Sequence, residues 1–337
     1  MDELRYREAE RRWFAHEGVT PLEHRVHLDR LDVDVRVLEV GEGEPTLFIH
    51  GAPNSGSTWM QLAARVSGLR CLVLDRPGTG LSAALPEPVR PHNLRRFAET
   101  LIVDVLDALQ VERVHLVASS FGGAVAIYTA AAHPGRIGRT VQMGCPAMAP
   151  GIRTPAFMRL MMTPGVGRLM GMLPPNPRAA RSILGHIGHG ASLDTGRIAD
   201  VFVDWSVALQ RDTDTMASEG AMIASAGGPR GFDPSLALPD DVLARVASPT
   251  SFLWGEDDVF GGHDVAEQLV AAMPDAQLVM LPAAGHLPWL DDPDRVASAV
   301  MTHLLQARPR PDPERPKQRP EHSRVRDAAA PTDGAGR

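Results

Sequence analysis

Short apolar runs alternate along this chain with longer stretches of helical spacing. The run at residues 33–40 (VDVRVLEV) alternates apolar and polar positions, which predicts a half-buried strand. The other runs lack this alternation and are flanked by helical patterns, which is typical of parallel strands that helices cover on both faces. The predicted strands are residues 33–40, 46–50, 71–75, 114–118, 140–144, 250–254 and 276–281, and the helices between them are residues 57–67, 92–110, 121–133, 263–273 and 292–306. The pattern therefore predicts an α/β fold with a mostly parallel sheet.

One long segment, residues 147–240, interrupts this alternation. It contains no convincing strand, and proline and glycine breaks separate helical patterns near residues 155–171, 177–187, 194–210 and 213–226. Nine of the 14 methionines lie between Met143 and Met222, and methionine suits either an ordinary core or an adaptable binding surface. Because the segment lies between two predicted strands, we predict an inserted helical cap.

The chain is expected to divide into four parts. Residues 1–30 form a charged helical segment, residues 31–146 and 241–307 form the α/β core, and residues 147–240 form the cap. Residues 308–337 are rich in proline and arginine and have almost no large apolar side chain. Burial in that tail cannot offset the entropy of ordering it, which predicts disorder.

Composition and charge narrow the class of protein. Hydrophobic residues make up 44 % and charged residues 22 % of the 337 positions, and the net charge of −7 provides no basic surface for nucleic acid. The charged N-terminal stretch is no signal peptide, and no apolar run reaches the roughly 18 residues of a membrane span. The two cysteines, Cys71 and Cys145, suit a reducing compartment. A cytoplasmic enzyme is expected, and its oligomeric state is left open.

The stretch VHLVASSFGGAVA (residues 114–126) passes from a predicted strand through two serines into a helical pattern. A sharp turn between strand and helix lifts a serine above its sheet, and the crowded backbone requires small residues two positions before and after it. Around Ser120 these residues are Ala118 and Gly122, whereas around Ser119 they would be a valine and a phenylalanine. Ser120 is therefore the predicted nucleophile.

This stretch resembles the nucleophile elbow of the α/β-hydrolase family, G-x-S-x-G, with Ala118 in place of the first glycine. The resemblance extends from Val33 to Gln306. It implies a twisted sheet of about eight strands with helices on both faces and an inserted helical cap. Family members that act on epoxides or haloalkanes carry aspartate at the elbow, so Ser120 implies the serine-nucleophile, esterase-like branch.

A serine hydroxyl needs a base, and the base needs an orienting acid. In this family both follow the serine along the chain. FLWGEDDVF (residues 252–260) resembles the acid loop W-G-x-x-D, which implies Asp258 as the acid and leaves Asp257 as the alternative. LPAAGHLPWLDDP (residues 281–293) resembles the histidine loop, which implies His286 as the base.

The remaining parts of the site also come from the resemblance. FIHGAPNSG (residues 48–56) resembles the loop H-G-x-P, which implies that the backbone N–H groups of Ala52 and Phe121 form the oxyanion hole. Four further residues are expected at the pocket: Cys145 and Trp289, together with Ser55 and Trp59, which should lie close to it or just behind it. The family's strand order separates the two cysteines by roughly 14 Å, so both are expected to be free thiols.

Two other motifs receive a structural interpretation. LDRPGTGLS (residues 74–82) matches a family loop, but it lacks the lysine of a P-loop and does not open a dinucleotide-binding unit. His186 and His189 lie one turn apart in GHIGH, and no third ligand lies near them in the sequence. We therefore predict no metal site and no bound cofactor.

Several reactions fit these residues. The main hypothesis is hydrolysis of a carboxylic ester of a small or medium apolar substrate through an acyl-enzyme. Residues 120–123 also resemble hydrolases that cleave carbon–carbon bonds in ring-cleavage products, although Leu287 stands where those enzymes often carry tryptophan, and Trp289 comes two residues later. Amidase, thioesterase, perhydrolase and tailoring activities stay open. A slow or non-catalytic receptor on the same fold is the alternative outside enzymes, and the complete triad disfavours it.

Overall fold

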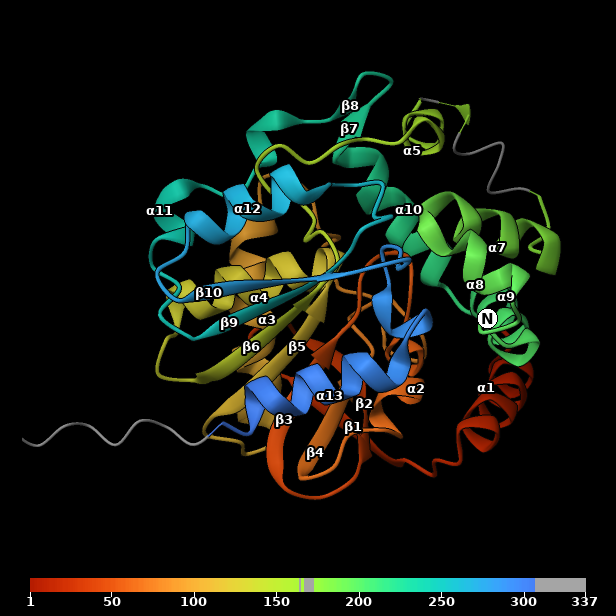
Figure 1. Ribbon diagram of the computed structural model, residues 1–337. Coiled ribbons are helices and arrows are strands. Elements are labelled where there is room, and N and C mark those ends of the chain that lie inside the picture. Colours follow the sequence, from red (N-terminus) through yellow and green to blue (C-terminus); the bar gives the residue numbers. More distant parts are fainter. Residues whose placement is uncertain (164, 167–172, 307–337) are drawn as a thin grey trace, which may run out of the picture. The chain divides into compact units, whose positions relative to one another are not determined.

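The computed structural model describes residues 1–163, 165–166 and 173–306, and these are built around an eight-stranded sheet (Figure 1). The strand order is β1-β2-β4-β3-β5-β6-β9-β10. β2 pairs antiparallel with both of its neighbours, and all other neighbouring strands are parallel. The strands are β1 Leu22–Leu28, β2 Val33–Val40, β3 Glu44–Ile49, β4 Leu69–Leu74, β5 Val114–Ser119, β6 Ile137–Met143, β9 Thr250–Gly255 and β10 Ala276–Leu281. The predicted fold class is confirmed.

Helices cover both faces of this sheet, and each face has its own apolar core. One face carries α3 (Leu94–Ala108), α4 (Ser120–Ala132), α11 (Asp240–Leu243) and α12 (His263–Ala271). The other carries α1 (Glu3–Glu17), the short η1 (Gly56–Trp59) and α2 (Met60–Ala63), η4 (Pro288–Leu290) and α13 (Pro293–Leu304). Central strand β3 sends Leu47 and Ile49 to the first core and Phe48 to the second, because successive side chains point to opposite faces of a sheet.

The segment between β6 and β9 is mainly helical, as the sequence predicts. Its helices are α5 Ala156–Met161, α7 Pro177–Leu184, the π-helical turn η2 Gly185–His189, α8 Gly190–Asp194, α9 Asp200–Asp212, α10 Thr215–Ser225 and the short η3 Pro234–Leu236. The only strands in its described part are β7 Gly227–Gly228 and β8 Gly231–Phe232, which form a two-residue ladder. The helix predicted at residues 155–171 is described only in part, because most of its residues after α5 lie outside the described residues. The tail predicted to be disordered, residues 308–337, also lies outside them.

Residues 1–30 contain the expected charged helix, but also a strand that the expectation of a helical segment missed. Helix α1 begins after Asp2, whose carboxylate accepts a hydrogen bond from the N–H of Arg5, and it ends at Gly18 with a φ of 71°. The chain then forms β1, the edge strand of the main sheet, paired antiparallel with β2. In β1 only Leu28 is buried, so this strand lacks the apolar pattern by which the other strands are recognised.

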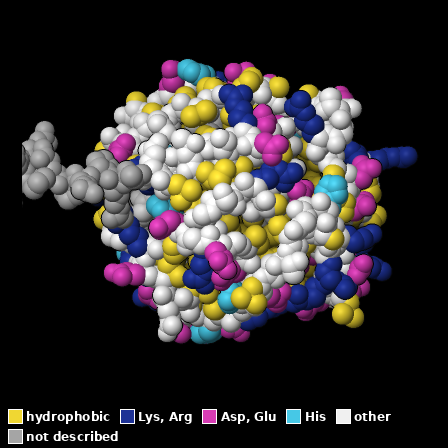
Figure 2. Space-filling view, turned by 60° about the horizontal axis from the view of Figure 1, so that its bottom comes forward, with side chains coloured by type: hydrophobic (Ala, Val, Ile, Leu, Met, Phe, Trp, Pro, Cys, Tyr) yellow, Lys and Arg dark blue, Asp and Glu magenta, His cyan; other side chains and the backbone are white. Residues whose placement is uncertain are grey.

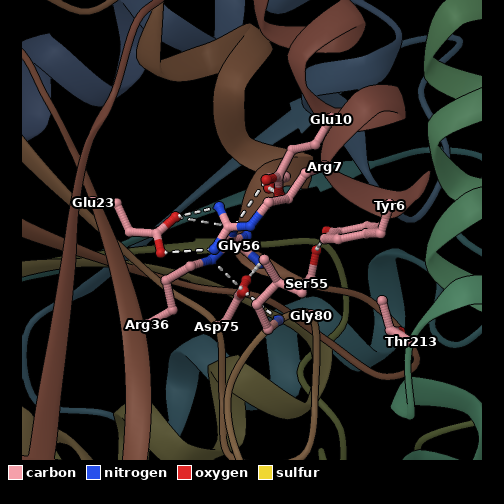
Figure 3. A network of polar contacts seen from close by, with 12 residues as sticks. Tyr6, Arg7, Glu10, Glu23, Arg36, Ser55, Gly56, Asp75, Gly80 and Thr213 are labelled. Atoms are coloured by element: carbon pink, nitrogen blue, oxygen red, sulfur yellow. Dashed lines mark hydrogen bonds and ion pairs between the residues drawn. The ribbon is translucent and has the colours of Figure 1, made fainter. Parts of the chain in front are cut away.

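A buried polar network joins α1 to the sheet (Figure 3). Arg36 of β2 has no exposed surface, and its guanidinium donates two hydrogen bonds to Glu10 of α1, of 2.8 and 2.6 Å, and one of 2.9 Å to Asp75. Asp75 also accepts from the N–H groups of Gly56 and Leu81. The loop at residues 74–82 is thus tied into this network, and its interpretation as a structural loop is supported.

The surface and the helices of the protein can be compared with what composition and charge predict. In the face shown in Figure 2, basic and acidic side chains are interspersed among hydrophobic ones. Within the described residues, no helix has the length and apolar character needed to cross a bilayer.

Cys71 and Cys145 are both buried and free, as predicted, since three strand positions separate β4, which contains Cys71, from β6, which Cys145 follows.

Candidate active site

The turn between β5 and α4 has the strained geometry expected of a nucleophile elbow. β5 ends at Ser119, and Ser120 begins α4 with a φ of 51°, a left-handed conformation that is unusual outside glycine. A Cβ atom at Gly122 would lie 2.3 Å from the carbonyl oxygen of Ile49. A Cβ atom at Gly51 would lie 2.6 Å from that of Ser120. The small residues around Ser120 are therefore required by close backbone contacts.

His286 and Asp258 form a hydrogen-bonded pair. Nδ1 of His286 lies 2.9 Å from Oδ2 of Asp258, and the ring of Phe260 lies 4.5 Å from the imidazole, centre to centre. Asp258 is buried and accepts two more hydrogen bonds, from the N–H groups of Cys145 (2.8 Å) and Phe260 (3.0 Å). These donors stabilise an ionised carboxylate and fix its orientation. With Nδ1–H directed at Asp258, Nε2 of His286 is free to accept a proton.

The alternative acid does not occupy this position. Asp257 and Glu256 are exposed, whereas Asp258 is the carboxylate beside His286. Cys145 is no rival nucleophile, because burial and the neighbouring Asp258 raise the pKa of its thiol well above the usual value. The residues that the structure brings together at this point are therefore Asp258 and His286.

The predicted oxyanion loop is held by a neutral histidine. Nε2 of His50 lies 3.2 Å from the backbone nitrogen of Arg76, so Nε2 must accept, and Nδ1–H donates to the carbonyl oxygen of Gly51 at 2.8 Å. Burial, reinforced by the charge of Arg76, lowers the pKa of His50 well below its usual value. His50 thus shapes the turn that leads to Ala52.

Arg76, which the sequence analysis did not single out, links the oxyanion loop to the helical segment above it. Its guanidinium donates to the carbonyl oxygens of His50 and Gly51, each at 3.1 Å, and pairs in two places with Glu219 of α10, at 3.1 and 2.8 Å. It also lies 4.9 Å above the centre of the Phe121 ring. Both side chains of the ion pair are almost fully buried. One arginine therefore contacts Phe121, one predicted oxyanion donor, and the two residues that precede Ala52, the other.

Ser120 and His286 line one cavity of about 440 Å³ together with Ala52, Phe121 and Cys145. Most of the other lining side chains are apolar and come from both the core and the segment between β6 and β9: Met148, Ile152, Phe157, Met158, Ile183, Ile187, Met222, Ile223, Phe232, Leu236 and Phe260. Besides His286 and the Cys145 thiol, the charged or titratable residues in the described part of the lining are Arg90 and Asp233. The cavity is thus suited to an apolar ligand with few polar groups.

Three of the four expected pocket residues lie elsewhere. Ser55 contacts the hydroxyl of Tyr6 at 3.1 Å, and Trp59 stacks on Trp289 with ring centres 4.1 Å apart. Both tryptophans are fully buried in the core on the other face of the sheet. Only Cys145 lines the cavity. Proximity in sequence to the H-G-x-P and histidine loops misled the prediction, because both tryptophans pack into the core on the face of the sheet opposite the cavity.

The histidines of GHIGH have other partners. His189 is fully buried, with Nδ1 at 2.8 Å from Asp291 and Nε2 at 3.2 Å from the backbone nitrogen of Leu287. Nδ1 of His186 contacts the carbonyl oxygen of Ser182. Within the described residues there is no group of three or more His, Cys, Asp or Glu side chains arranged to hold a metal ion.

Comparison with known proteins gives the family. A 2-hydroxy-6-oxononadienedioate/2-hydroxy-6-oxononatrienedioate hydrolase of Cupriavidus pinatubonensis is 28 % identical over 255 residues, which are 74 % of this chain and 82 % of that protein. The structure of carboxylesterase CesB from Bacillus subtilis matches with a TM-score of 0.70 at 21 % identity, over 90 % of this chain and 98 % of the other. A 2-hydroxy-6-oxo-6-phenylhexa-2,4-dienoate hydrolase from a Rhodococcus species gives a TM-score of 0.70 at 19 % identity, over 86 % and 100 %.

These solved structures share the fold of this chain. The model of the alpha/beta hydrolase family matches residues 46–299, a range that includes the elbow, the acid loop and the histidine loop. The chain is a member of the alpha/beta hydrolase family, and it is a hydrolase.

Proposed function

We propose that this protein hydrolyses a carbon–carbon bond in a ring-cleavage product that carries one carboxylate and a large apolar group. The proposed catalytic residues are Ser120, His286 and Asp258, with the N–H groups of Ala52 and Phe121 as oxyanion donors. This reverses the order of the two main hypotheses drawn from the sequence, because the curated relatives are named for such substrates and because of one residue in the cavity.

That residue is Arg90. It is half-buried at the cavity, and its Nη1 donates to the carbonyl oxygens of Val89 (3.1 Å) and Ala221 (3.3 Å). Arg90 forms no ion pair with any residue that the structure describes. A guanidinium in an apolar cavity is best stabilised by an anion, so a carboxylate on the substrate supplies the missing counter-charge. A neutral ester would not.

The cavity also supports a monoanion over a dianion. Among the described residues of the lining, Arg90 is the only arginine or lysine, and Asp233 would repel a second carboxylate. The Cupriavidus relative is named for a dioate, which has two carboxylates, whereas the Rhodococcus enzyme is named for a phenyl-substituted monoacid. The apolar lining favours a substrate of the second kind.

The proposed reaction assigns one role to each of these residues. Oγ of Ser120 attacks the ketone carbon that bears the apolar group, Nε2 of His286 takes the hydroxyl proton, and Ala52 and Phe121 stabilise the oxyanion. Bond cleavage requires the diketo form of the substrate, in which the 2-hydroxyl proton has moved to the carbon next to the attacked ketone. The bond between these two carbons then breaks, its electron pair passes into the conjugated enone to give a dienolate, and His286 returns the serine proton to that dienolate. Water, activated by His286, hydrolyses the acyl-enzyme to the apolar carboxylic acid.

Ester hydrolysis is the second candidate, and one observation favours it. Leu287 stands where carbon–carbon hydrolases of the family often carry tryptophan, and Trp289 is fully buried away from the cavity. The same serine, base and oxyanion donors would serve an ester without change. The choice between the two bonds therefore rests on whether Arg90 binds a carboxylate.

A substrate pair tests this choice. We expect 2-hydroxy-6-oxo-6-phenylhexa-2,4-dienoate, followed by loss of its absorbance, to be turned over with a higher kcat/KM than p-nitrophenyl butyrate or the nonadienedioate. Arg90→Gln should raise KM for the dienoate with little change in kcat, because it removes an interaction present in ground and transition states alike. The control is Arg96→Gln, the same charge change at an exposed arginine of α3. Turnover of the ester without the dienoate would make the protein an esterase, and Ser120→Ala should abolish both.

A further inference from the structure

We propose that His189 and Asp291, a second buried aspartate–histidine pair, are positioning residues that hold the loop of His286 in place for proton transfer. The proposal rests on His286 acting as the base in the proposed function, whichever bond is cleaved. Neither residue lines the cavity, so both act through the loop at residues 285–287.

Three consecutive backbone N–H groups of that loop are held by groups outside it. The N–H of Gly285 donates to Oδ2 of Asp291 at 2.9 Å, and that of His286 donates to the carbonyl oxygen of Ile187 at 2.9 Å. The N–H of Leu287 donates to Nε2 of His189 at 3.2 Å. Two of the three acceptors belong to η2, in the segment between β6 and β9. The position of the base is therefore set largely by η2, and not only by β10, the strand that precedes the loop.

The chemistry of the pair fixes the tautomer of His189. A backbone N–H can only donate, so Nε2 of His189 accepts and the proton lies on Nδ1, which donates to Asp291 at 2.8 Å. The other oxygen of Asp291 accepts from the hydroxyl of Ser192 at 2.6 Å. Without the carboxylate, the other tautomer would set an N–H against the N–H of Leu287. Asp291 therefore keeps Nε2 available as an acceptor.

Backbone packing makes this arrangement rigid. Gly188 has a φ of 100°, and a Cβ atom on it would lie 2.4 Å from the carbonyl oxygen of Asp257 and 2.7 Å from Cα of Gly285. A Cβ atom on Gly285 would lie 2.7 Å from the carbonyl oxygen of Ile187. The turn thus passes directly against both the acid loop and the histidine loop, and it cannot shift without moving them.

The same turn also reaches the cavity. Ile187 lines the cavity, while its carbonyl oxygen binds the N–H of His286. A displacement of the turn would therefore move the base relative to Ser120. Because a misplacement of about 1 Å can cost roughly 100-fold in rate, loss of the pair should reduce kcat much more than substrate binding.

The test compares Asp291→Ala with a matched control, Asp104→Ala. Asp104 is equally buried and accepts from the N–H groups of Arg30 and Leu31 and from the Arg30 side chain, on α3 and remote from the loop. We would measure kcat and KM on whichever substrate the wild type turns over, the rate at which a fluorophosphonate labels Ser120, and the thermal midpoint. Asp291→Ala should lower kcat and labelling about 100-fold with KM nearly unchanged, and Asp104→Ala should lower only the midpoint.

Two conservative variants separate positioning from folding. Asp291→Asn keeps an oxygen that accepts from His189 and Gly285 and an amide that donates to Ser192, so it should recover most of kcat. His189→Gln should retain more activity than His189→Ala, because its carbonyl oxygen can accept from Leu287. These soluble variants also decide the matter if Asp291→Ala does not fold.

Wild-type kcat and labelling in folded Asp291→Ala and His189→Ala would overturn the proposal. So would an equal loss of kcat in Asp104→Ala, because the effect would then be general destabilisation. Labelling reports on Ser120 whichever bond is cleaved, so failure of the dienoate assay leaves this test intact.

Discussion

Arg36 and Arg76 are two buried guanidinium groups with different surroundings. Arg36 meets Glu10 and Asp75 directly, with Glu23 at 3.6 Å, so acids outnumber the cation. Arg76 meets one carboxylate, Glu219, and donates the rest of its hydrogen bonds to the oxyanion loop. Arg36 joins α1 to the edge of the sheet (Figure 3), whereas Arg76 joins α10 to the predicted site. We therefore expect the buried guanidinium of Arg36 to support stability and that of Arg76 to align the predicted site.

The largest expected effect is the fall in kcat when the predicted catalytic acid is changed, and the effects at Arg76 and Arg36 can be compared with it. Asp258→Asn should lower kcat by about 10⁴-fold, because the amide cannot hold the reactive tautomer of His286. Asp257→Asn is the matched control and should leave kcat unchanged, since its side chain is exposed. Steady-state kinetics of the two variants would decide the acid, and an unaffected Asp258→Asn would remove Asp258 from the site.

The second prediction concerns Arg76→Lys. Lysine keeps the charge but cannot bind Glu219 in two places and both carbonyl oxygens at once. The oxyanion loop should shift, and we expect kcat to fall about 100-fold with a smaller change in KM. Kinetics on the substrate that the wild type prefers would measure this. A fall in thermal midpoint with normal kcat would place Arg76 in the same class as Arg36.

The third prediction is the same substitution at the other site. Arg36→Lys should lower the free energy of unfolding by about 2 kcal/mol, through lost charge-assisted hydrogen bonds to Glu10 and Asp75. The kcat per folded molecule should not change. Urea unfolding followed by fluorescence would measure the first quantity, and a parallel loss of kcat would show that α1 also supports the site.

The smallest effect should appear with pH. The hydrogen bond from Arg7 lowers the pKa of Glu23 from 4.5 to about 2, with help from the charge of Arg36. Stability from Glu23 is therefore present above pH 4.5 and is lost as the pH falls from about 4.5 to about 2. Glu23→Gln should be less stable than the wild type at pH 6, and urea midpoints of the two should converge toward pH 3. A gap of constant size would contradict this.

The pKa of Asp75, at the centre of the same network, shifts in the opposite direction to that of Glu23. Burial, offset in part by Arg36, raises the pKa of this carboxyl, so acidification relieves the cost of its charge rather than adding to it. Loss of stability of the Arg36 network in acid should thus come from protonation of Glu23 and not of Asp75.

The sequence was sufficient wherever the information is local. The strand at residues 33–40 occurs with the predicted bounds, since its alternation is a local signal. It is not half-buried as that alternation predicts, because Arg36 and Leu38 on its second face are buried as well. The steric argument that chose Ser120 over Ser119 needs only neighbouring residues, and the positive φ of Ser120 agrees with it. The roles of Ser120, Asp258 and His286 stay predictions until their variants are measured.

Pairings between distant segments were beyond the sequence. Arg76 and Glu219, or His189 and Asp291, lie too far apart along the chain for spacing to connect them. β1 was missed because an edge strand with one buried residue carries no alternation. The sequence placed Trp59 and Trp289 at the pocket, whereas they pack on the other face of the sheet. The face that a loop side chain occupies depends on φ and ψ angles, and no residue pattern encodes these.

The tie between α1 and Arg36 matters for anyone who trims this protein. The match to the family model starts at residue 46, so a version cut to that range would lack α1, β1 and β2. It would remove two strands from one edge of the sheet, leave β4 as the new edge, and deprive Asp75 of its cation while uncovering Trp59. The first 45 residues belong to the smallest unit worth expressing.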